Sequence, residues 1–325
     1  KNARSGQLLA VSSRALASAE AFAKEHGAPR AYSDHGALLA DPDVDAVYIA
    51  TPHPAHAELS CEAIRAGKHV LCEKPLAMNA AETDAIIEAA KAAGVVVMEA
   101  FMYRCHPLTA RLVELIRQGE LGAVKLVQAA FSFHAPFDPH ARLFAKELGG
   151  GGILDVGCYP ASFAGLIADA VAGAGVVAAE VVGALGELHP QTGTDVWTIA
   201  NLQFANGLAA QISCGTQVNQ SNVARVYGDQ AWVEIPSPWI VSREGGEWSF
   251  NLHRNGAESP ERISGFDERS IYGIEADHFA NLVARRPNAA PGMSLADTQR
   301  LSRLLEKWRR DIGVVYVSDS SPNAR

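Results

Sequence analysis

Short apolar runs alternate with helix-like segments through the first hundred residues, and this alternation strongly limits how the chain can fold. The apolar runs lie at 7–13, 45–50, 69–72 and 95–100, and the segments with helical periodicity lie at 15–26, 35–41, 56–67 and 79–94. Gly27 and Gly94 stand where two of these helices should end. Strands that are apolar throughout and alternate with helices form parallel sheets covered on both faces. The sequence therefore predicts an α/β fold built on such a sheet.

From about residue 123 the pattern becomes typical of an antiparallel sheet. Three longer segments carry polar residues at alternate positions: 123–133, 195–217 and 222–235. Asn206-Gly207 and Gly228-Asp229 are dipeptides that favour tight hairpin turns. We expect a meander with one buried face and one face in contact with water.

The length of 325 residues is more than one ordinary core accommodates, so two domains are expected. The change of pattern places them at 1–102 and 103–325. The second domain contains a glycine run at 149–152 with a helix after it, and helical segments at 275–286 and 294–310. We expect the terminal helix to pack back on the first domain.

Composition excludes several classes of protein. Hydrophobic residues make up 48% and charged residues 20%, which is typical of a globular chain. The net charge of −8 argues against nucleic-acid binding. No apolar stretch is long enough to predict a membrane span. The five cysteines show no C-x-x-C spacing, which favours reduced thiols in a reducing compartment.

Polar or aromatic groups follow each of the four predicted strands. They are Ser12-Ser13-Arg14, Thr51-Pro52-His53, Glu73-Lys74-Pro75 and Glu99-Ala100-Phe101. Ligands bind at the carboxyl ends of strands in an open parallel sheet. Ordinary caps and turns explain any one of these groups, but they explain all four less well. We therefore predict a ligand-binding edge there.

Arg14 bears on the choice of dinucleotide. Dinucleotide-binding folds usually place Asp or Glu near this point to hold the ribose of NAD, whereas Arg accommodates the 2′-phosphate of NADP. Arg14 beside Ser12 and Ser13 therefore favours NADP, with NAD as an alternative. A solvated surface arginine is the other interpretation.

Asp155 and Tyr159 form a second candidate group. They are four residues apart and share one helical face. A phenol has an ordinary pKa of about 10, so it needs a nearby cation to act in acid–base chemistry at neutral pH. Lys74 is the candidate cation. The alternative is a tyrosine hydroxyl that satisfies a buried hydrogen bond. No recognised zinc spacing is present, so no metal is predicted.

Several of these segments, taken in order, resemble the Gfo/Idh/MocA (glucose–fructose oxidoreductase / inositol dehydrogenase) family. They are AVSSR, DAVYIATPHPAH, AGKHVLCEKPLAMN, VVVMEAFMYRCHP, RQGELGAVKLV and GGGGILDVGCYP. The resemblance implies a Rossmann-type, doubly wound parallel sheet, followed by an α+β domain with a large, open, mostly antiparallel sheet. It also implies a homo-oligomer, a dimer or tetramer, formed through that sheet.

The resemblance assigns roles to individual residues. Lys74 matches the catalytic lysine of the E-K-P motif, and a cis bond is implied at Pro75. Many relatives have His at the position of Tyr159; tyrosine there is similar to the sugar oxidoreductase and dimeric dihydrodiol dehydrogenase branch. His53 departs from the family's usual Asn, which leaves the contact made there open.

The family also opens with a strand and a G-x-G-x-x-G turn, and neither precedes Leu8. The expectation at this stage is that the chain lacks its natural N-terminus. The alternative is that another segment fills the place of this strand.

The expected activity is hydride transfer between a nicotinamide and a secondary alcohol or carbonyl of a sugar, polyol or cyclic trans-diol. Tyr159 exchanges the hydroxyl proton, and Lys74 lowers the pKa of Tyr159 and orients the substrate oxygen. Asp155 either binds a substrate hydroxyl or positions the proton relay. The expected substrate-binding residues are Lys74, Phe101, Arg104, Asp155 and Tyr159. The expected cofactor-binding residues are Ser12, Ser13, Arg14, Thr51, Pro52, His53, His56, Glu73, Lys74 and Pro75.

A non-catalytic, dinucleotide-sensing regulatory protein of the same fold is the alternative. The expected location is the cytoplasm, and the periplasm stays open because any export signal would lie in the N-terminal part that the sequence is expected to lack.

Overall fold

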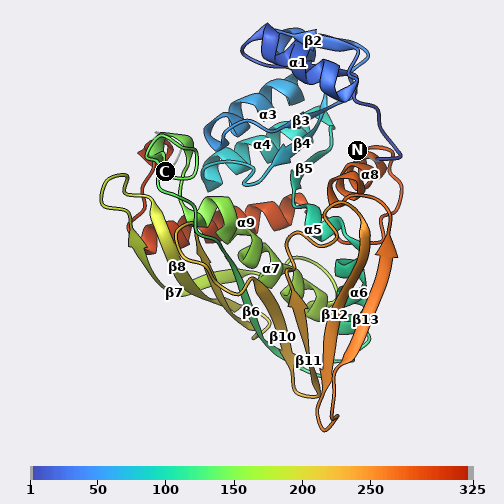
Figure 1. Ribbon diagram of the computed structural model, residues 1–325, viewed down its shortest axis with the longest axis vertical. Helices are drawn as coiled ribbons and strands as arrows, with labels where there is room; N and C mark the ends of the chain where they lie inside the picture. Colours follow the sequence, from blue (N-terminus) through green and yellow to red (C-terminus); the bar gives the residue numbers. More distant parts are fainter. Residues whose placement is uncertain (1–2, 321–325) are drawn as a thin grey trace.

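The computed structural model describes residues 3–320. In the N-terminal region the strands form two small parallel sheets (Figure 1). One pairs β1 (Ala10–Ser12) with β2 (Arg30–Tyr32), and the other has the order β3 (Ala46–Ile49), β4 (His69–Glu73), β5 (Val97–Ala100). The helices here are α1 (Leu16–His26), α2 (His35–Leu39), η1 (His53–Ala55), α3 (His56–Arg65) and α4 (Ala80–Ala93).

The predicted parallel pairing of the N-terminal strands is confirmed, but it differs from the expectation in two details. Within residues 3–320, no backbone pairing joins β1–β2 to β3–β5, so the strands do not form one sheet. Strand β2 was not expected, because its three residues carry no apolar run. The predicted helix ends are confirmed: Gly27 and Gly94 have φ of 73° and 68°, which glycine adopts without strain.

The C-terminal region is built on an eight-stranded sheet with the order β13-β12-β11-β10-β6-β9-β8-β7. The strands are β6 (Val124–Ser132), β7 (Ala179–Leu188), β8 (Asp195–Phe204), β9 (Ala209–Gly215), β10 (Val223–Gly228), β11 (Ala231–Pro236), β12 (Gly246–Arg254) and β13 (Glu261–Asp267). The predicted turns join β8 to β9 and β10 to β11. The meander is interrupted, because β6 pairs with β9 in parallel. Strands β7, β12 and β13 were not predicted.

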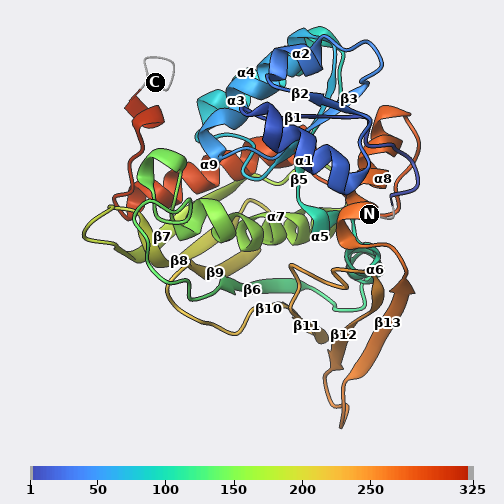
Figure 2. The ribbon, with the colours of Figure 1, turned by 45° about the horizontal axis from the view of Figure 1, so that its top comes forward.

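Helices cover one face of this sheet and separate it from the N-terminal region (Figure 2). They are α5 (Met102–Cys105), α6 (Pro107–Arg117), α7 (Cys158–Ala172), α8 (Ile271–Val283) and α9 (Leu295–Asp311), with short turns η2 (Lys146–Leu148), η3 (Ile153–Gly157) and η4 (Val317–Ser320). Exposed side chains, among them Ile199, lie on the other face of the sheet, which has a shallow groove.

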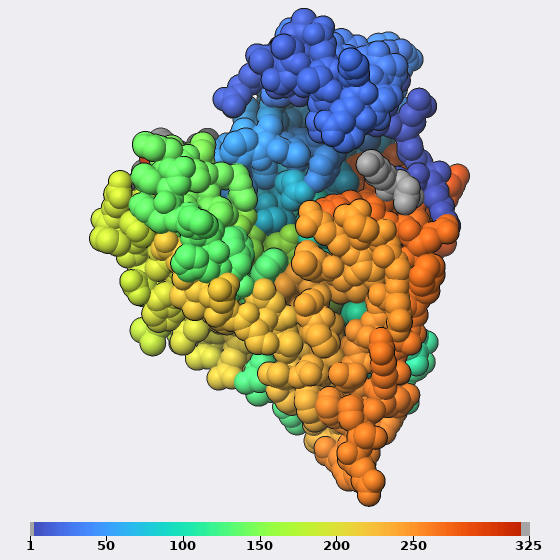
Figure 3. Space-filling view, viewed as in Figure 1, coloured from blue at the N-terminus to red at the C-terminus, as the bar shows by residue number. Residues whose placement is uncertain are grey.

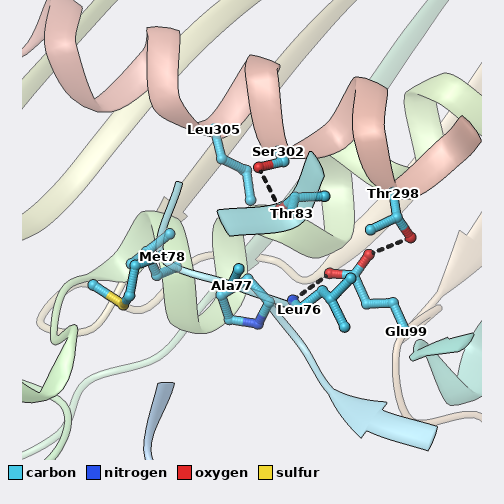
Figure 4. Close-up of a pocket in the computed structure, with 10 residues that line it drawn as sticks. Leu76, Ala77, Met78, Thr83, Glu99, Thr298, Ser302 and Leu305 are labelled. Atoms are coloured by element: carbon cyan, nitrogen blue, oxygen red, sulfur yellow. Dashed lines mark hydrogen bonds between the residues drawn. The ribbon is translucent and has the colours of Figure 1, made fainter. Parts of the chain in front are cut away.

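Helix α9 joins the two regions. It contacts α4 on one side and α7 and β7 on the other. Figure 4 shows Glu99 at this seam, where its carboxylate accepts hydrogen bonds from the Leu76 N–H at 2.9 Å and the Thr298 hydroxyl at 2.8 Å. The Thr83 and Ser302 hydroxyls are 3.0 Å apart beside it. The residues that follow Lys74 are therefore held between β5 and α9.

The helical run Lys146–Ala172 is long and apolar enough to cross a membrane by length and composition. Its most apolar stretch is completely buried inside the protein. Core helices commonly meet the same criteria, so this run, which contains the predicted glycine run and the helix after it, is a core element.

Candidate active site

Lys74 lies where β4 ends, and its ammonium group contacts Asp155 twice. Nζ is 2.5 Å from the Asp155 carbonyl oxygen and 3.4 Å from Asp155 Oδ1. The Lys74 side chain is 13% exposed and the Asp155 side chain 8% exposed. The peptide bond from Lys74 to Pro75 is cis, which confirms what the family resemblance implied. The ammonium is thus held at the carboxyl end of a parallel strand.

Arg142 is a member of this cluster that the sequence did not reveal. Its Nη1 donates to Asp155 Oδ1 at 3.0 Å, the oxygen that Lys74 also approaches. The Arg142 side chain is 46% exposed, so part of its guanidinium faces outward. A recess lies between the N-terminal region and the C-terminal strands, with the green segment around 135–150 beside it (Figure 3).

The charges of this cluster stabilise one another. Burial acts to raise the pKa of Asp155, but Lys74 and Arg142 act more strongly together, and the pKa is lowered. Burial acts to lower the pKa of Lys74, and Asp155 reverses this, so the pKa of Lys74 is raised. Burial and Lys74 lower the pKa of His53 to about 3. At neutral pH the cluster therefore contains an ammonium, a guanidinium, a carboxylate and a neutral imidazole.

Tyr159 lies against Lys74 through its ring rather than its hydroxyl. Lys74 Nζ is 5.3 Å from the ring centroid, and the hydroxyl is 3.6 Å from Met102 Sδ. Phe101 and Phe131 pack edge-on against the ring at 5.2 Å between centroids. Burial raises the pKa of Tyr159 well above its ordinary value. The prediction that Lys74 lowers this pKa is wrong for this arrangement, because burial raises the pKa and the hydroxyl lies against Met102 rather than the ammonium.

Asp155 belongs to one turn of π-helix, Ile153–Gly157, that continues directly into α7. Lys74 contacts both the Asp155 backbone in this turn and the Tyr159 ring at the start of α7. Such turns occur frequently at functional sites. The predicted shared face of Asp155 and Tyr159 is therefore seen, although it depends on a turn that the spacing did not predict.

At the predicted ligand-binding edge, one polar group is available to bind a ligand. Thr51 Oγ1, just after β3, is enclosed and has no hydrogen-bond partner among residues 3–320. A buried hydroxyl normally has a partner, so a bound polar ligand suits it. Ser12 Oγ lies 2.8 Å from His35 Nδ1, Ser13 is partly exposed, and Arg14 is exposed after β1.

Other polar side chains at this edge already form hydrogen bonds with groups of the protein. The Tyr48 hydroxyl donates to the Glu73 carboxylate. Both ring nitrogens of His56 lie 2.8 Å from backbone carbonyl oxygens, those of Thr51 and Pro75. His56 therefore has no free nitrogen for a cofactor and instead holds the Thr51 and Pro75 turns together; Pro52 precedes the short helix η1.

Three further predicted residues are buried. His53 is 4% exposed, and its Nδ1 lies 3.2 Å from the Gly149 carbonyl oxygen. Phe101 is 1% exposed and packs in the aromatic cluster. Arg104 is 2% exposed and donates to the carbonyl oxygens of Pro291 and Gly292, so the predicted substrate contact is not supported by its position. Over the described range, no group of three His, Cys, Asp or Glu residues is placed to hold a metal ion.

Comparison with known families decides the affiliation. A model described as "Oxidoreductase family, NAD-binding Rossmann fold" matches residues 1–101, and the GFO/IDH/MocA C-terminal domain matches residues 109–234. The chain belongs to the Gfo/Idh/MocA oxidoreductase family. This confirms the predicted family, the predicted fold class and the prediction of an NAD(P)-dependent oxidoreductase.

Relatives within the family span nearly the whole chain. The trans-1,2-dihydrobenzene-1,2-diol dehydrogenase of Mus musculus is 33% identical over 96% of this chain and 91% of its own length. The enzyme of the same name from Xenopus tropicalis is 32% identical over 95% of this chain and 91% of its own length.

Two solved structures have the same fold. A 3-ketoreductase from Actinomadura kijaniata, in complex with NADP and TDP-benzene, is 26% identical, with a TM-score of 0.81 over 95% of this chain and 91% of that chain. An aldose-aldose oxidoreductase from Caulobacter crescentus, complexed with glycerol, is 27% identical, with a TM-score of 0.79 over 94% of this chain and 89% of that chain.

Proposed function

We propose that this protein is an NADP-preferring oxidoreductase that acts on a secondary alcohol or carbonyl of a sugar, polyol or cyclic trans-diol. The observation that carries the proposal is the paired Lys74 and Asp155 at the carboxyl end of β4, directly beside Tyr159. The dihydrodiol dehydrogenases and sugar-acting enzymes that the chain resembles support this substrate class.

The residues suit proton exchange at a substrate oxygen. The nicotinamide, when bound, supplies or accepts the hydride. Lys74 presents an ammonium that polarises a carbonyl oxygen, and Asp155 fixes this ammonium. Tyr159 is a neutral phenol, so it is in the right state to give a proton to an alkoxide that develops during reduction. In the reduction of a carbonyl, we therefore propose that Tyr159 is the proton donor.

Arg142 is added to the proposed substrate-binding residues. Its guanidinium contacts Asp155 and is half-exposed, so its remaining N–H groups are available to substrate oxygens. The proposed substrate set is therefore Lys74, Asp155, Tyr159 and Arg142. The buried Phe101 and Arg104 are not part of this set.

The NADP preference rests on Arg14 and the serines before it. Arg14 is exposed and makes no ion pair with any residue from 3 to 320, so its guanidinium is free to meet a 2′-phosphate. Thr51, with its unpaired hydroxyl, is the other proposed cofactor contact.

The larger organisation is also a proposal. The dinucleotide-binding domain is 1–102 and the substrate domain is 103–325. The open face of the eight-stranded sheet exposes Leu185 (67%) and Ile199 (44%), which favours a homo-oligomer formed there. The five cysteines are free and four are buried, which favours the cytoplasm.

One observation favours a non-catalytic, dinucleotide-sensing protein instead: the Tyr159 hydroxyl faces Met102 rather than Lys74. Nicotinamide absorbance with a panel of aldoses, ketoses, polyols and cyclic diols separates the two functions. Turnover supports the enzyme, whereas NADP binding without turnover across the panel supports the sensor.

A matched pair of variants tests the role of Tyr159. Tyr159→Phe is expected to lower kcat by about a hundredfold or more. Tyr103→Phe is the control, because Tyr103 lies in the same aromatic cluster and its hydroxyl bonds to Ser162 at 3.0 Å. Equal losses in both variants would remove the proposed proton-exchange role.

A further inference from the structure

Asp195 on β8 is a buried carboxylate that the proposed chemistry does not use. It is 1% exposed, and its Oδ2 accepts a hydrogen bond from the Ile153 backbone N–H at 2.8 Å. Its Oδ1 has no hydrogen-bond partner within the described residues. Burying a carboxylate with one unpaired oxygen is costly, so its presence at this point calls for a reason.

The glycine run is shaped around this carboxylate. A Cβ at Gly151 would lie 2.3 Å from Asp195 Oδ1, and a Cβ at Gly152 would lie 3.1 Å from Asp195 Oδ2. Gly151 also has a φ of +119°, which side chains rarely allow. Two glycines of the run are therefore needed for the Asp195 side chain to reach the backbone.

The contact continues from Asp195 to the catalytic cluster. The Asp155 N–H donates to the Gly151 carbonyl oxygen at 3.3 Å, and the Asp155 carbonyl oxygen accepts from Lys74 at 2.5 Å. The turn held by Asp195 is thus the same turn whose backbone positions the ammonium. A carboxylate also suits this end of the helix, where unpaired N–H groups carry partial positive charge.

Other contacts hold the glycine run on its remaining sides. The Gly150 and Gly151 N–H groups donate to the carbonyl oxygens of Ala145 and Leu143 at 3.0 and 2.9 Å. The Tyr316 hydroxyl donates to the Gly150 carbonyl oxygen at 2.5 Å. Asp195 is the charged member of this set. It holds the C-terminal end of the glycine run, which leads into the π-helical turn and α7.

We propose that Asp195 is a positioning residue: its carboxylate fixes the turn 151–155 and thereby the placement of Lys74 and Asp155 for the proposed reaction. The kcat measurements in the test below rest on the proposed function, whereas the hydrogen-exchange measurements do not.

The pH dependence gives the proposal a signature. Burial raises the pKa of Asp195 to about 6, while the N–H groups of Ile153, Asp195 and Gly152 act in the opposite direction. The ionisable groups that face it are Arg309 on α9, Tyr316 after α9 and Cys214 on β9. The pKa values of Tyr316 and Cys214 are raised far above neutrality, so neither titrates near pH 6.

Activity and stability then respond to the pH in opposite directions. Ionisation near pH 6 strengthens the hold on the Ile153 N–H, so kcat is expected to rise as the pH passes about 6. Because the pKa of Asp195 is higher in the folded than in the unfolded protein, its contribution to stability is full below about pH 4 and is lost as the pH rises to about 6. Glu99, with a pKa raised to about 7 by burial, also titrates nearby, so the comparison needs variants.

Asp195→Asn is the main variant, because it retains the size and one acceptor oxygen but removes the charge. It is expected to lower kcat about tenfold or more with dinucleotide binding unchanged, and to remove the rise in kcat near pH 6. Thr198→Val is the control on the same strand. It removes hydrogen bonds from Trp308 at 2.9 Å and to the Leu185 carbonyl oxygen at 2.8 Å, neither of which involves residues 151–155.

Gly152→Ala provides a second perturbation that leaves the charge in place. Its φ of −68° accepts alanine, but the added Cβ displaces the Asp195 carboxylate. We expect the same loss of kcat, and the double variant with Asp195→Asn is expected to lose less than the sum of the two.

Hydrogen exchange tests the structural part of the proposal, that Asp195 fixes the turn, whether or not a substrate is found. Faster exchange of the amides at 151–155 in Asp195→Asn, with no change there in Thr198→Val, supports the proposal. Unchanged exchange at 151–155 overturns it. Where turnover is measured, a kcat for Asp195→Asn that matches Thr198→Val also overturns it.

Discussion

Lys74 contacts both the backbone and the side chain of Asp155, through the carbonyl oxygen at 2.5 Å and Oδ1 at 3.4 Å. The two residues come from different regions of the protein, β4 and the turn before α7. Any shift between these regions therefore changes the position of the ammonium, which makes this contact the centre of the proposed site.

Arg142 is expected to help keep the pKa of Asp155 low and to bind the substrate. Arg142→Gln removes a cation that helps to lower the pKa of Asp155, so this pKa rises. We expect the acid limb of kcat/KM to move to higher pH and KM to rise about tenfold. Profiles of kcat/KM against pH measure both effects. Arg111→Gln, which breaks an exposed pair with Glu114, should leave the profile unchanged.

Arg14 is expected to select the dinucleotide. Arg14→Ala should weaken NADP binding about tenfold or more and leave NAD binding nearly unchanged, because charge-assisted contacts to a 2′-phosphate are lost. Fluorescence titration of both reduced cofactors gives the two affinities. The exposed Arg65 serves as the control. A parallel loss for both cofactors would contradict the assignment.

Much of the fold follows from the sequence, and the exceptions have physical causes. Long apolar runs and glycine-terminated helices locate β3, β4, β5, α1 and α4. The three residues of β2 carry no such pattern. The parallel pairing of β6 with β9 depends on contacts between segments about 80 residues apart, which local periodicity does not encode.

Less of the candidate site than of the fold could be predicted from the sequence. Lys74 and Asp155 are found from strand ends and motif spacing, and the structure brings them together. Arg142 lies in an irregular segment where an arginine usually means a solvated surface, so only its three-dimensional contact reveals it. Arg104 was predicted to contact the substrate but is buried. Its partners are carbonyl groups nearly 190 residues away, which the sequence pattern does not reveal.

His53 is expected to make stability depend on pH. Its pKa is about 3 in the folded protein and about 6.5 when unfolded, so the unfolded state binds more protons between these values. Stability from the neutral His53 is therefore full above about pH 6.5 and is lost as the pH falls. His53→Asn should flatten the dependence of the unfolding free energy on pH between 4 and 6.5, measured by urea denaturation. An unchanged slope would contradict this account.

Arg309 is expected to join α9 to the N-terminal region. It is 1% exposed, and its guanidinium donates to the Met78 carbonyl oxygen at 2.8 Å and pairs with Asp319 at 3.0 Å. Arg309→Ala should cost about 3 kcal/mol of unfolding free energy, because a buried charge loses its partner. Arg310→Ala removes an exposed pair with Glu306 and should cost about 0.5 kcal/mol. Similar costs for both variants, measured by urea denaturation, would argue against this role.

The most direct test of the central claim is the turnover of Lys74→Met beside that of Lys68→Met. Lys68 is also buried, and its Nζ donates to the Asp41 carbonyl oxygen at 2.8 Å, but it lies outside the site. We expect Lys74→Met to lose about two to four orders of magnitude in kcat with NADPH affinity retained, and Lys68→Met to keep its kcat. A kcat for Lys74→Met within a few fold of the unmodified protein would contradict the account.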